Sequence, residues 1–147
     1  MQLPEYVSKA EVQRVCRELG LRDWSQLTEA RIHLEEAGII QAEVGREAER
    51  ISLDDFRKGL EVELEHGLAF PDANVTQNHP ILTGRIVLAH LKETLDYYVR
   101  LEVAELEGDL MKALVKGDAA TLERKYRLLV AARAHLAGHE KAQIDKL

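Results

Sequence analysis

The sequence contains a single cysteine and no long apolar run, and each shortage excludes a class of protein. The lone thiol, Cys16, cannot form an internal disulfide and cannot by itself build a zinc knuckle or an iron–sulfur cluster. No apolar run approaches the ~20 residues of a membrane-spanning helix, and the N-terminal hexapeptide lacks the basic start of a signal peptide. We therefore expect a cytoplasmic protein that has no membrane partner.

The chain also lacks an excess of positive charge. Its 20 Lys and Arg residues are outnumbered by 26 Asp and Glu residues, so the formal net charge is −6. Proteins that follow the phosphates of nucleic acids normally carry a basic stripe, so we do not expect a nucleic-acid partner. The acidic balance is compatible with a bound cation or with a basic protein partner.

Helix-forming residues are what the chain has in abundance. Leu, Ala, Glu and Arg dominate its composition, and no segment sustains the alternation typical of a strand. A chain of 147 residues suits one domain, which buries about 68–70% of its unfolded surface. We predict an all-α fold, a single domain over 1–147 that forms a bundle of five to six helices with a long C-terminal α-hairpin.

Capping residues before an apolar periodicity, and glycines after it, mark where helices begin and end. Residues 39–51 are ambiguous, and a long connection precedes the fourth helix. The expected helices are Ser8–Gly20, Thr28–Gly38, Ser52–Gly67, Leu82–Thr94, Asp96–Gly117, and a last one from Asp118 towards the C-terminus.

Two of the expected helices carry a carboxylate and an imidazole in mirrored order. Glu63 precedes His66 on the third helix, whereas His90 precedes Glu93 on the fourth. Residues three apart lie on one face, one turn from each other. If the helices are antiparallel, the two histidines meet at one level and the two glutamates at the next, about 4.5 Å along the axis. We expect His90 to share one side of its helix with the apolar Ile86.

Two imidazoles and two carboxylates that converge inside a helical bundle are typical ligands of a transition metal. The glutamates neutralise a divalent charge that an apolar interior would otherwise reject. Because the two pairs run in opposite order, the pattern favours a mononuclear site over a dinuclear carboxylate centre. We predict that Glu63, His66, His90 and Glu93 bind a divalent transition metal, namely zinc, iron or manganese.

Other interpretations remain open. The same four residues would also suit a buried hydrogen-bonded network or simple salt bridges between helices. His135 and His139 lie one turn apart, a spacing that can chelate zinc, but without an evident third ligand they favour a solvated face. Glu102 and Glu105 are additional candidate ligands, and Tyr97 or Glu65 is a candidate acid–base group. No standard enzyme motif is present, so catalytic residues stay unassigned.

Four blocks between Leu53 and Glu102 form a distinctive pattern: Val62-Glu-Leu-Glu-His-Gly67, Leu82-Thr-Gly84, Leu88-Ala-His-Leu-Lys-Glu93 and Asp96-Tyr-Tyr98. With these blocks the chain resembles an uncharacterised family of small helical proteins from bacteria, archaea and phages. Family members usually lack the stretch Thr28–Ile51, so the resemblance implies an insertion there. The chain then consists of N-terminal helices with this insertion (1–51), a family-like core (52–102) and a C-terminal hairpin (103–147). The resemblance implies a shared functional centre that includes both polar pairs.

Two functions are compatible with these observations. The first is a metal-binding helical protein, a hydrolase or an oxidoreductase of unidentified substrate. The alternative is a non-catalytic interaction or structural protein, phage-encoded, that acts through an acidic helical surface. In that case apolar residues of the hairpin would pair copies into a homo-oligomer or bind a protein partner. These residues are Leu110, Leu114, Leu129 and Leu136.

Overall fold

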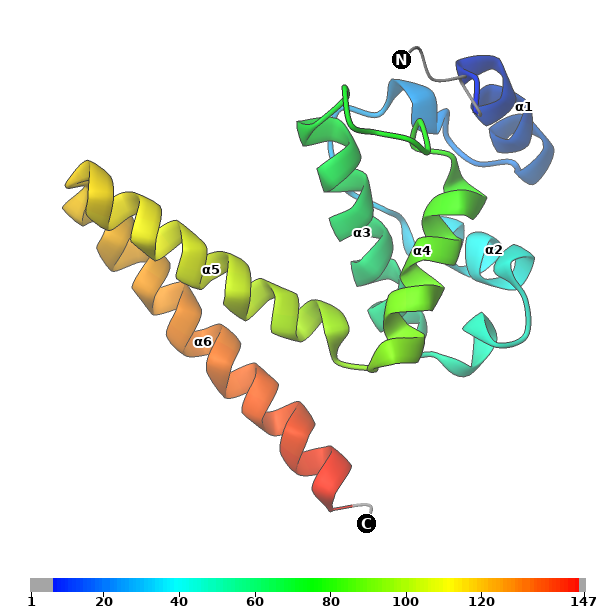
Figure 1. Ribbon diagram of the computed structural model, residues 1–147. Coiled ribbons are helices and arrows are strands. Elements are labelled where there is room, and N and C mark those ends of the chain that lie inside the picture. Colours follow the sequence, from blue (N-terminus) through cyan, green and yellow to red (C-terminus); the bar gives the residue numbers. More distant parts are fainter. Residues whose placement is uncertain (1–6, 146–147) are drawn as a thin grey trace. The chain divides into compact units, whose positions relative to one another are not determined.

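A computed structural model describes residues 7–145, which contain six α-helices, two short 3₁₀ turns and no strand (Figure 1). The all-α prediction is confirmed. The N-terminal hexapeptide, which we expect not to begin a signal peptide, lies outside the described residues. No helix within 7–145 is long and apolar enough to cross a membrane. The elements are α1 (Lys9–Leu19), η1 (Trp24–Gln26), α2 (Leu34–Val44), η2 (Ala48–Arg50), α3 (Leu53–Ala69), α4 (Pro80–Glu93), α5 (Tyr97–Lys116) and α6 (Ala119–Ile144).

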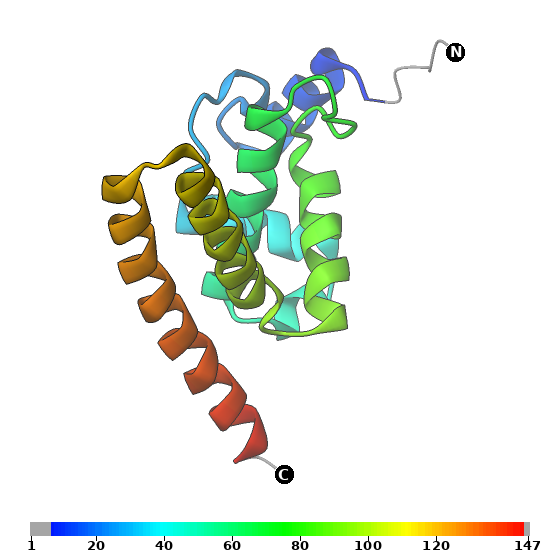
Figure 2. The ribbon, with the colours of Figure 1, turned by 60° about the vertical axis from the view of Figure 1, so that its left-hand side comes forward.

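The chain divides into two compact units, the first ending at Leu95 and the second beginning at Asp96. In the first unit α2, α3 and α4 pack against one another, and α1 contacts η1 and α4. Figures 1 and 2 show that α3 and α4 run antiparallel, joined by the loop 70–79. The largest fully buried side chains of this unit include Trp24, Phe56, Ile40, Leu60 and Leu64.

The place where the three central helices meet depends on Gly84 of α4. A Cβ atom at this position would lie 2.8 Å from Val44 and 2.9 Å from Ile40, both on α2, and 3.4 Å from the ring of Phe56 on α3. Only a residue without a side chain lets the helices approach this closely. Gly84 therefore belongs to the buried face of α4, which also contains Thr83, Val87 and Leu91.

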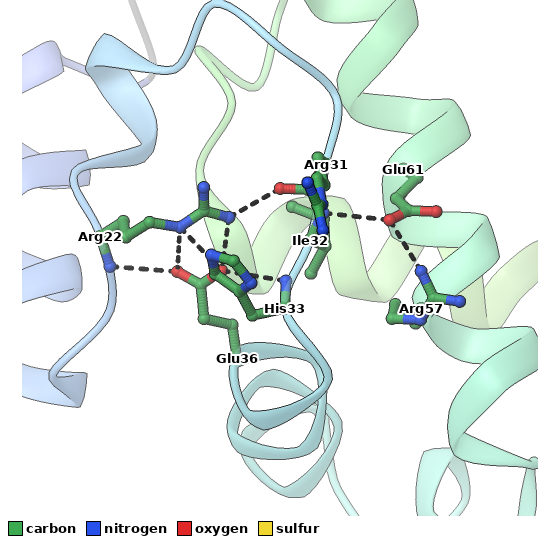
Figure 3. Close-up of polar contacts among 7 residues, drawn as sticks. All are labelled: Arg22, Arg31, Ile32, His33, Glu36, Arg57 and Glu61. Atoms are coloured by element: carbon green, nitrogen blue, oxygen red, sulfur yellow. Dashed lines mark hydrogen bonds and ion pairs between the residues drawn. The ribbon is translucent and has the colours of Figure 1, made fainter.

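The start of α2 differs from the prediction. Thr28 does not cap a helix, and Gly38 lies inside α2, which begins at Leu34 after His33. The Glu36 carboxylate accepts hydrogen bonds from the backbone N–H of His33 (3.3 Å) and from Arg22 Nε (3.0 Å) and Nη2 (2.6 Å) (Figure 3). The bonds from Arg22 come from a residue 14 positions earlier, so local periodicity could not reveal them.

A second carboxylate anchors the same segment to α3. Glu61 Oε1 accepts hydrogen bonds from the Ile32 N–H (3.0 Å) and from Arg57 Nη1 (2.8 Å), as Figure 3 shows. Arg22 Nη2 also donates to the Arg31 carbonyl oxygen (2.7 Å). The extended stretch before α2 is thus attached by charged side chains on both sides.

The start of α4 is capped by a residue that the sequence did not point to. His79 is buried, and its Nδ1 atom accepts hydrogen bonds from the N–H groups of Ile81 (3.2 Å) and Leu82 (3.4 Å). The helix consequently begins at Pro80, two residues before the predicted Leu82. Proline suits this first position because the N–H that it lacks would have no partner within the helix.

Protonation of His79 is expected to weaken this cap, since Nδ1 accepts a hydrogen bond only when it is unprotonated. Burial lowers the pKa of His79 below its usual value, while Glu11 raises it and Arg14 and Arg85 lower it. A depressed pKa in the folded state gives stability that is complete above about pH 6.5 and is lost as the pH falls through the folded pKa.

Urea unfolding at pH 7 and pH 5 tests this expectation in the wild type and in His79→Asn. Asparagine caps helices well and does not titrate in this range. The variant should lose less stability between the two pH values than the wild type, and an equal loss in both proteins would contradict the role of His79.

The second unit is a helical hairpin of α5 and α6, which lie side by side in Figures 1 and 2. Asp118 caps α6 and Gly117 ends α5 in the left-handed conformation, as predicted. The unit has nine acidic and nine basic residues, so the net charge of −6 belongs entirely to the first unit. Its small core consists of Leu106, Leu129 and Ala132, with Val103 and Leu110 packed against it.

Cys16 is a core residue of α1, as its place in the apolar periodicity suggests. It is buried, and burial raises the pKa of its thiol. The thiol is therefore protonated and shielded at neutral pH.

Candidate functional site

The structure brings together one member of each polar pair. Glu63 on α3 and His90 on α4 face each other, with 3.0 Å between Glu63 Oε1 and His90 Nδ1. The Glu63 side chain is 15% exposed and that of His90 is 30% exposed, so both lie partly within the packing between the helices. A carboxylate in such a position can hold a neutral imidazole in one tautomer or pair with its protonated form.

The other two residues lie away from this contact. Because Glu63 is opposite His90 and the helices are antiparallel, His66 and Glu93 lie one turn away in opposite directions, about 9 Å apart along the axes. Both side chains are exposed. The predicted arrangement, with histidine opposite histidine, is therefore wrong by one helical turn.

The rotation of α4 explains why Glu93 is exposed. The buried face of this helix is formed by Thr83, Val87 and Leu91, rather than by the side that carries Ile86 and His90. At 100° per residue, His90 lies on the flank of that face and Glu93 lies further round towards solvent. On α3, Glu63 falls within the stripe formed by the buried residues Phe56, Leu60 and Leu64, and His66 lies on its flank.

A cleft of about 240 Å³ opens beside the pair, between α3, α4 and the loop that joins them. Glu63 and His66 line it, so the two α3 residues of the prediction share one space. Its polar groups are a carboxylate, an imidazole, hydroxyls and an amide, and they alternate with apolar walls. The lining residues are Glu63, His66, Gly67, Phe70, Ala73, Asn74, Val75, Thr76, Thr83 and Ile86.

Gly67 allows the loop to fold against α3, which continues to Ala69 instead of ending at this glycine as predicted. A Cβ atom here would collide with Asn78 Oδ1 and would lie 2.8 Å from Asn74 Nδ2. Asn74 Nδ2 donates to the Gly67 carbonyl oxygen (3.2 Å) and to Asn78 Oδ1 (2.7 Å). Thr76 Oγ1 donates to Asn74 Oδ1 (3.1 Å), which fixes the amide in the cleft wall.

These loop residues are the part of the site that sequence reasoning missed. The loop places Gln77 and Asn78 in the left-handed region, with φ of 52° and 58°. Asparagine tolerates that conformation and bonds to nearby backbone groups, so an Asn-rich connection was the available signal of an ordered loop.

Glu63, which lines the cleft, and His90 beside it form a pair that could share an ion. Glu63 Oε1 and His90 Nδ1 are 3.0 Å apart, close to the separation of about 3.3 Å between two ligands of a tetrahedral zinc ion. Within residues 7–145, however, no three His, Cys, Asp or Glu side chains are already gathered in an arrangement that would hold a metal. Of the other candidates, Tyr97, Glu102 and Glu105 belong to the second unit.

The fold and the cleft define an all-α protein that has a small cleft between two antiparallel helices. The chain belongs to the family described as "Protein of unknown function (DUF5661)", whose model matches residues 12–107. That match extends from α1 into α5 and includes all four residues of the polar pairs. No curated protein and no solved structure matches the chain.

Proposed function

We propose that the protein binds a divalent transition metal at the cleft between α3 and α4. The observation that carries this proposal is the contact between Glu63 and His90, a carboxylate oxygen and an imidazole nitrogen 3.0 Å apart at a partly buried position. A zinc, iron or manganese ion can replace the proton between these atoms if the distance between the two ligands increases slightly.

His66 is the third ligand in this proposal. It lies one turn from Glu63 on the same helix and lines the same cleft, so rotation of its exposed side chain brings the ring towards the pair. Glu93 lies one turn away on the other side of the pair, and the geometry gives it no direct place among the ligands. Water or a small ligand in the cleft would complete the coordination.

A metal in this position would act as a Lewis acid on whatever occupies the cleft. The protein side chains define the rest of the chemistry. Thr83 and Asn74 present a hydroxyl and an amide to the same space, and Phe70 and Ile86 provide apolar walls. A cleft of about 240 Å³ suits a small polar molecule rather than a polymer.

Metal analysis of the untagged full-length protein tests the proposal. We expect close to one equivalent of transition metal at this site, and its loss in Glu63→Ala and in His90→Ala. The measurement is made in a His135→Ala/His139→Ala background, so that imidazoles of α6 do not contribute. Glu65→Ala is the matched control, because Glu65 is an exposed glutamate of the same helix and should leave the metal content unchanged.

Two results would overturn the proposal. The first is a protein that contains no transition metal and takes up none on titration with zinc, iron or manganese. The second is unchanged occupancy in both Glu63→Ala and His90→Ala. In either case Glu63 and His90 would be an ion pair that holds two helices together, and its removal would affect stability alone.

A second candidate function, assembly through the α5–α6 hairpin, is supported by the surface of that hairpin. Near its turn a groove of about 400 Å³ is lined by apolar side chains, among which Met111 and Leu114 are both 61% exposed. Because the hairpin has no net charge, electrostatic repulsion would not oppose the pairing of two copies. Light scattering on the protein prepared for metal analysis separates the two functions, since a monomer that contains metal argues against this one.

A further inference from the structure

The exposed face of α6 carries two histidines whose rings converge. His135 Nε2 and His139 Nε2 are 3.1 Å apart, with the ring centroids 4.7 Å apart and the ring planes at 86°. Both residues belong to one continuous helix, so their spacing is set by the helical repeat and does not depend on the packing of other elements. We propose that His135 and His139 form a second site, separate from the cleft, that binds a divalent first-row transition metal such as zinc or nickel.

The separation of the nitrogen atoms is what a shared ion requires. Two imidazole ligands at 2.0–2.1 Å from a tetrahedral zinc ion are about 3.3 Å apart, and the two Nε2 atoms need to separate by only a few tenths of an ångström. Each neutral imidazole has one nitrogen lone pair available for a ligand bond. In the metal-free protein one Nε2 would donate a hydrogen bond to the other, which holds the two Nε2 atoms close together.

The surroundings leave room for an ion and its remaining ligands. An open hollow of about 360 Å³ beside the rings is lined, apart from the histidines, by Ala134, Gly138 and Ala142. A Cβ atom on Gly138 would have no other atom of residues 7–145 within 4 Å, so the helix surface is open beside the two rings. The two histidines occupy two coordination positions, and water can fill the others from the solvent side.

This site differs from the cleft in a way that can be measured. Its two ligands lie on one helix, where His135 is exposed and His139 partly exposed, whereas Glu63 and His90 join two helices and are partly buried. An ion at the α6 site should therefore exchange with chelators readily and bind the late metals that favour nitrogen ligands. If both proposals hold, the full-length protein binds two equivalents of metal, and each site is lost separately.

Calorimetric titration of the untagged, chelator-treated full chain with Zn²⁺ and with Ni²⁺ tests the inference. The titration is carried out in a Glu63→Ala/His90→Ala background, which leaves only the α6 site. We expect one equivalent to bind. Because loss of even an outer partner of a metal ligand typically costs 10–100-fold in affinity, removal of one ligand in His139→Ala should weaken binding by at least tenfold.

The matched control keeps the number of histidines and changes only their spacing. In Ala137→His/His139→Ala the second imidazole lies two residues from His135, about 200° round the helix, where it cannot share an ion with the first. Ala137 is exposed, so the added ring should not disturb folding, which circular dichroism can check. This variant should bind as weakly as His139→Ala.

The proposal is overturned if the Glu63→Ala/His90→Ala protein binds no metal, or if Ala137→His/His139→Ala binds as tightly as the parent with His135 and His139. It is supported if binding is lost in His139→Ala and in the respaced variant but not in a surface control such as Lys141→Ala. Failure of the cleft proposal leaves this result unaffected, because the background lacks that site.

Discussion

Replacing Phe56 with alanine is expected to lower the free energy of unfolding by about 3–5 kcal/mol, the largest single loss that we expect. Phe56 is fully buried, and its ring reaches the point where Gly84 of α4 meets α2. Alanine would leave a cavity where three helices meet, and close-packed neighbours fill such a space only in part. Urea unfolding followed by circular dichroism measures the change.

The chain provides a matched control, because it contains only one other phenylalanine, Phe70. Phe70 is 60% exposed, so the same substitution there removes little buried surface and should cost less than about 1 kcal/mol. Similar losses for Phe56→Ala and Phe70→Ala would contradict the packing described for the first unit.

Replacing Glu36 with alanine is the second change for which we expect a large effect, about 2–3 kcal/mol of stability. The Glu36 side chain is 9% exposed and accepts hydrogen bonds from both the backbone and the guanidinium of Arg22. Without the carboxylate, these donors and the N–H of His33 lose their partner. Arg22 is 37% exposed and can still reach water, which keeps the loss below that of a fully buried pair.

The shifted pKa of Glu36 predicts the direction in which stability changes with pH. Burial alone would raise the pKa of Glu36, but the hydrogen bonds from Arg22 and His33 outweigh it, and the pKa is held below its usual value. A depressed pKa gives stability that is present above about pH 4.5 and is lost as the pH falls through the folded pKa. The wild type should therefore lose more stability between pH 5 and pH 3 than Glu36→Gln, which cannot titrate.

Glu35 is the control for both measurements. It precedes Glu36 in the first turn of α2 but is exposed, so Glu35→Ala should change stability by less than about 0.5 kcal/mol. A pH profile of Glu36→Gln that parallels the wild type would show that the bonds to Arg22 contribute nothing to folding.

Local signals in the sequence predicted most helix ends of the fold. Ser8, Ser52 and Asp118 each accept a hydrogen bond from the N–H three residues later, as their positions suggested. Gly20 and Gly117 end helices with positive φ, as predicted. These features are decided by residues within one or two turns, so the sequence displays them directly.

The helix ends that could not be predicted depend on distant residues. Arg22 holds the Glu36 carboxylate at the start of α2, and the loop after α3 folds back onto Gly67. Neither Arg22 nor Asn74 belongs to the pattern of the helix that it stabilises. The spacing of residues along the sequence therefore predicted helix ends at Gly38 and Gly67, although both glycines lie inside helices.

At the candidate site, too, one feature could be predicted from the sequence and another could not. The mirrored pairs pointed to a contact between α3 and α4, which Glu63 and His90 make, but the pattern could not set the register between the two helices. A shift of one turn leaves every residue on the same face and moves it only about 5 Å along the axis, so the apolar pattern is satisfied either way. In the structure Glu63 pairs with His90, and the two histidines do not lie opposite each other.

The buried state of Cys16 has a practical consequence for studies in solution. Since the natural thiol is shielded and protonated, a cysteine introduced at an exposed position would react with a maleimide or a spin label far faster than the natural one. Fluorescent or paramagnetic probes can therefore be attached at chosen pairs of surface sites without first removing a core residue.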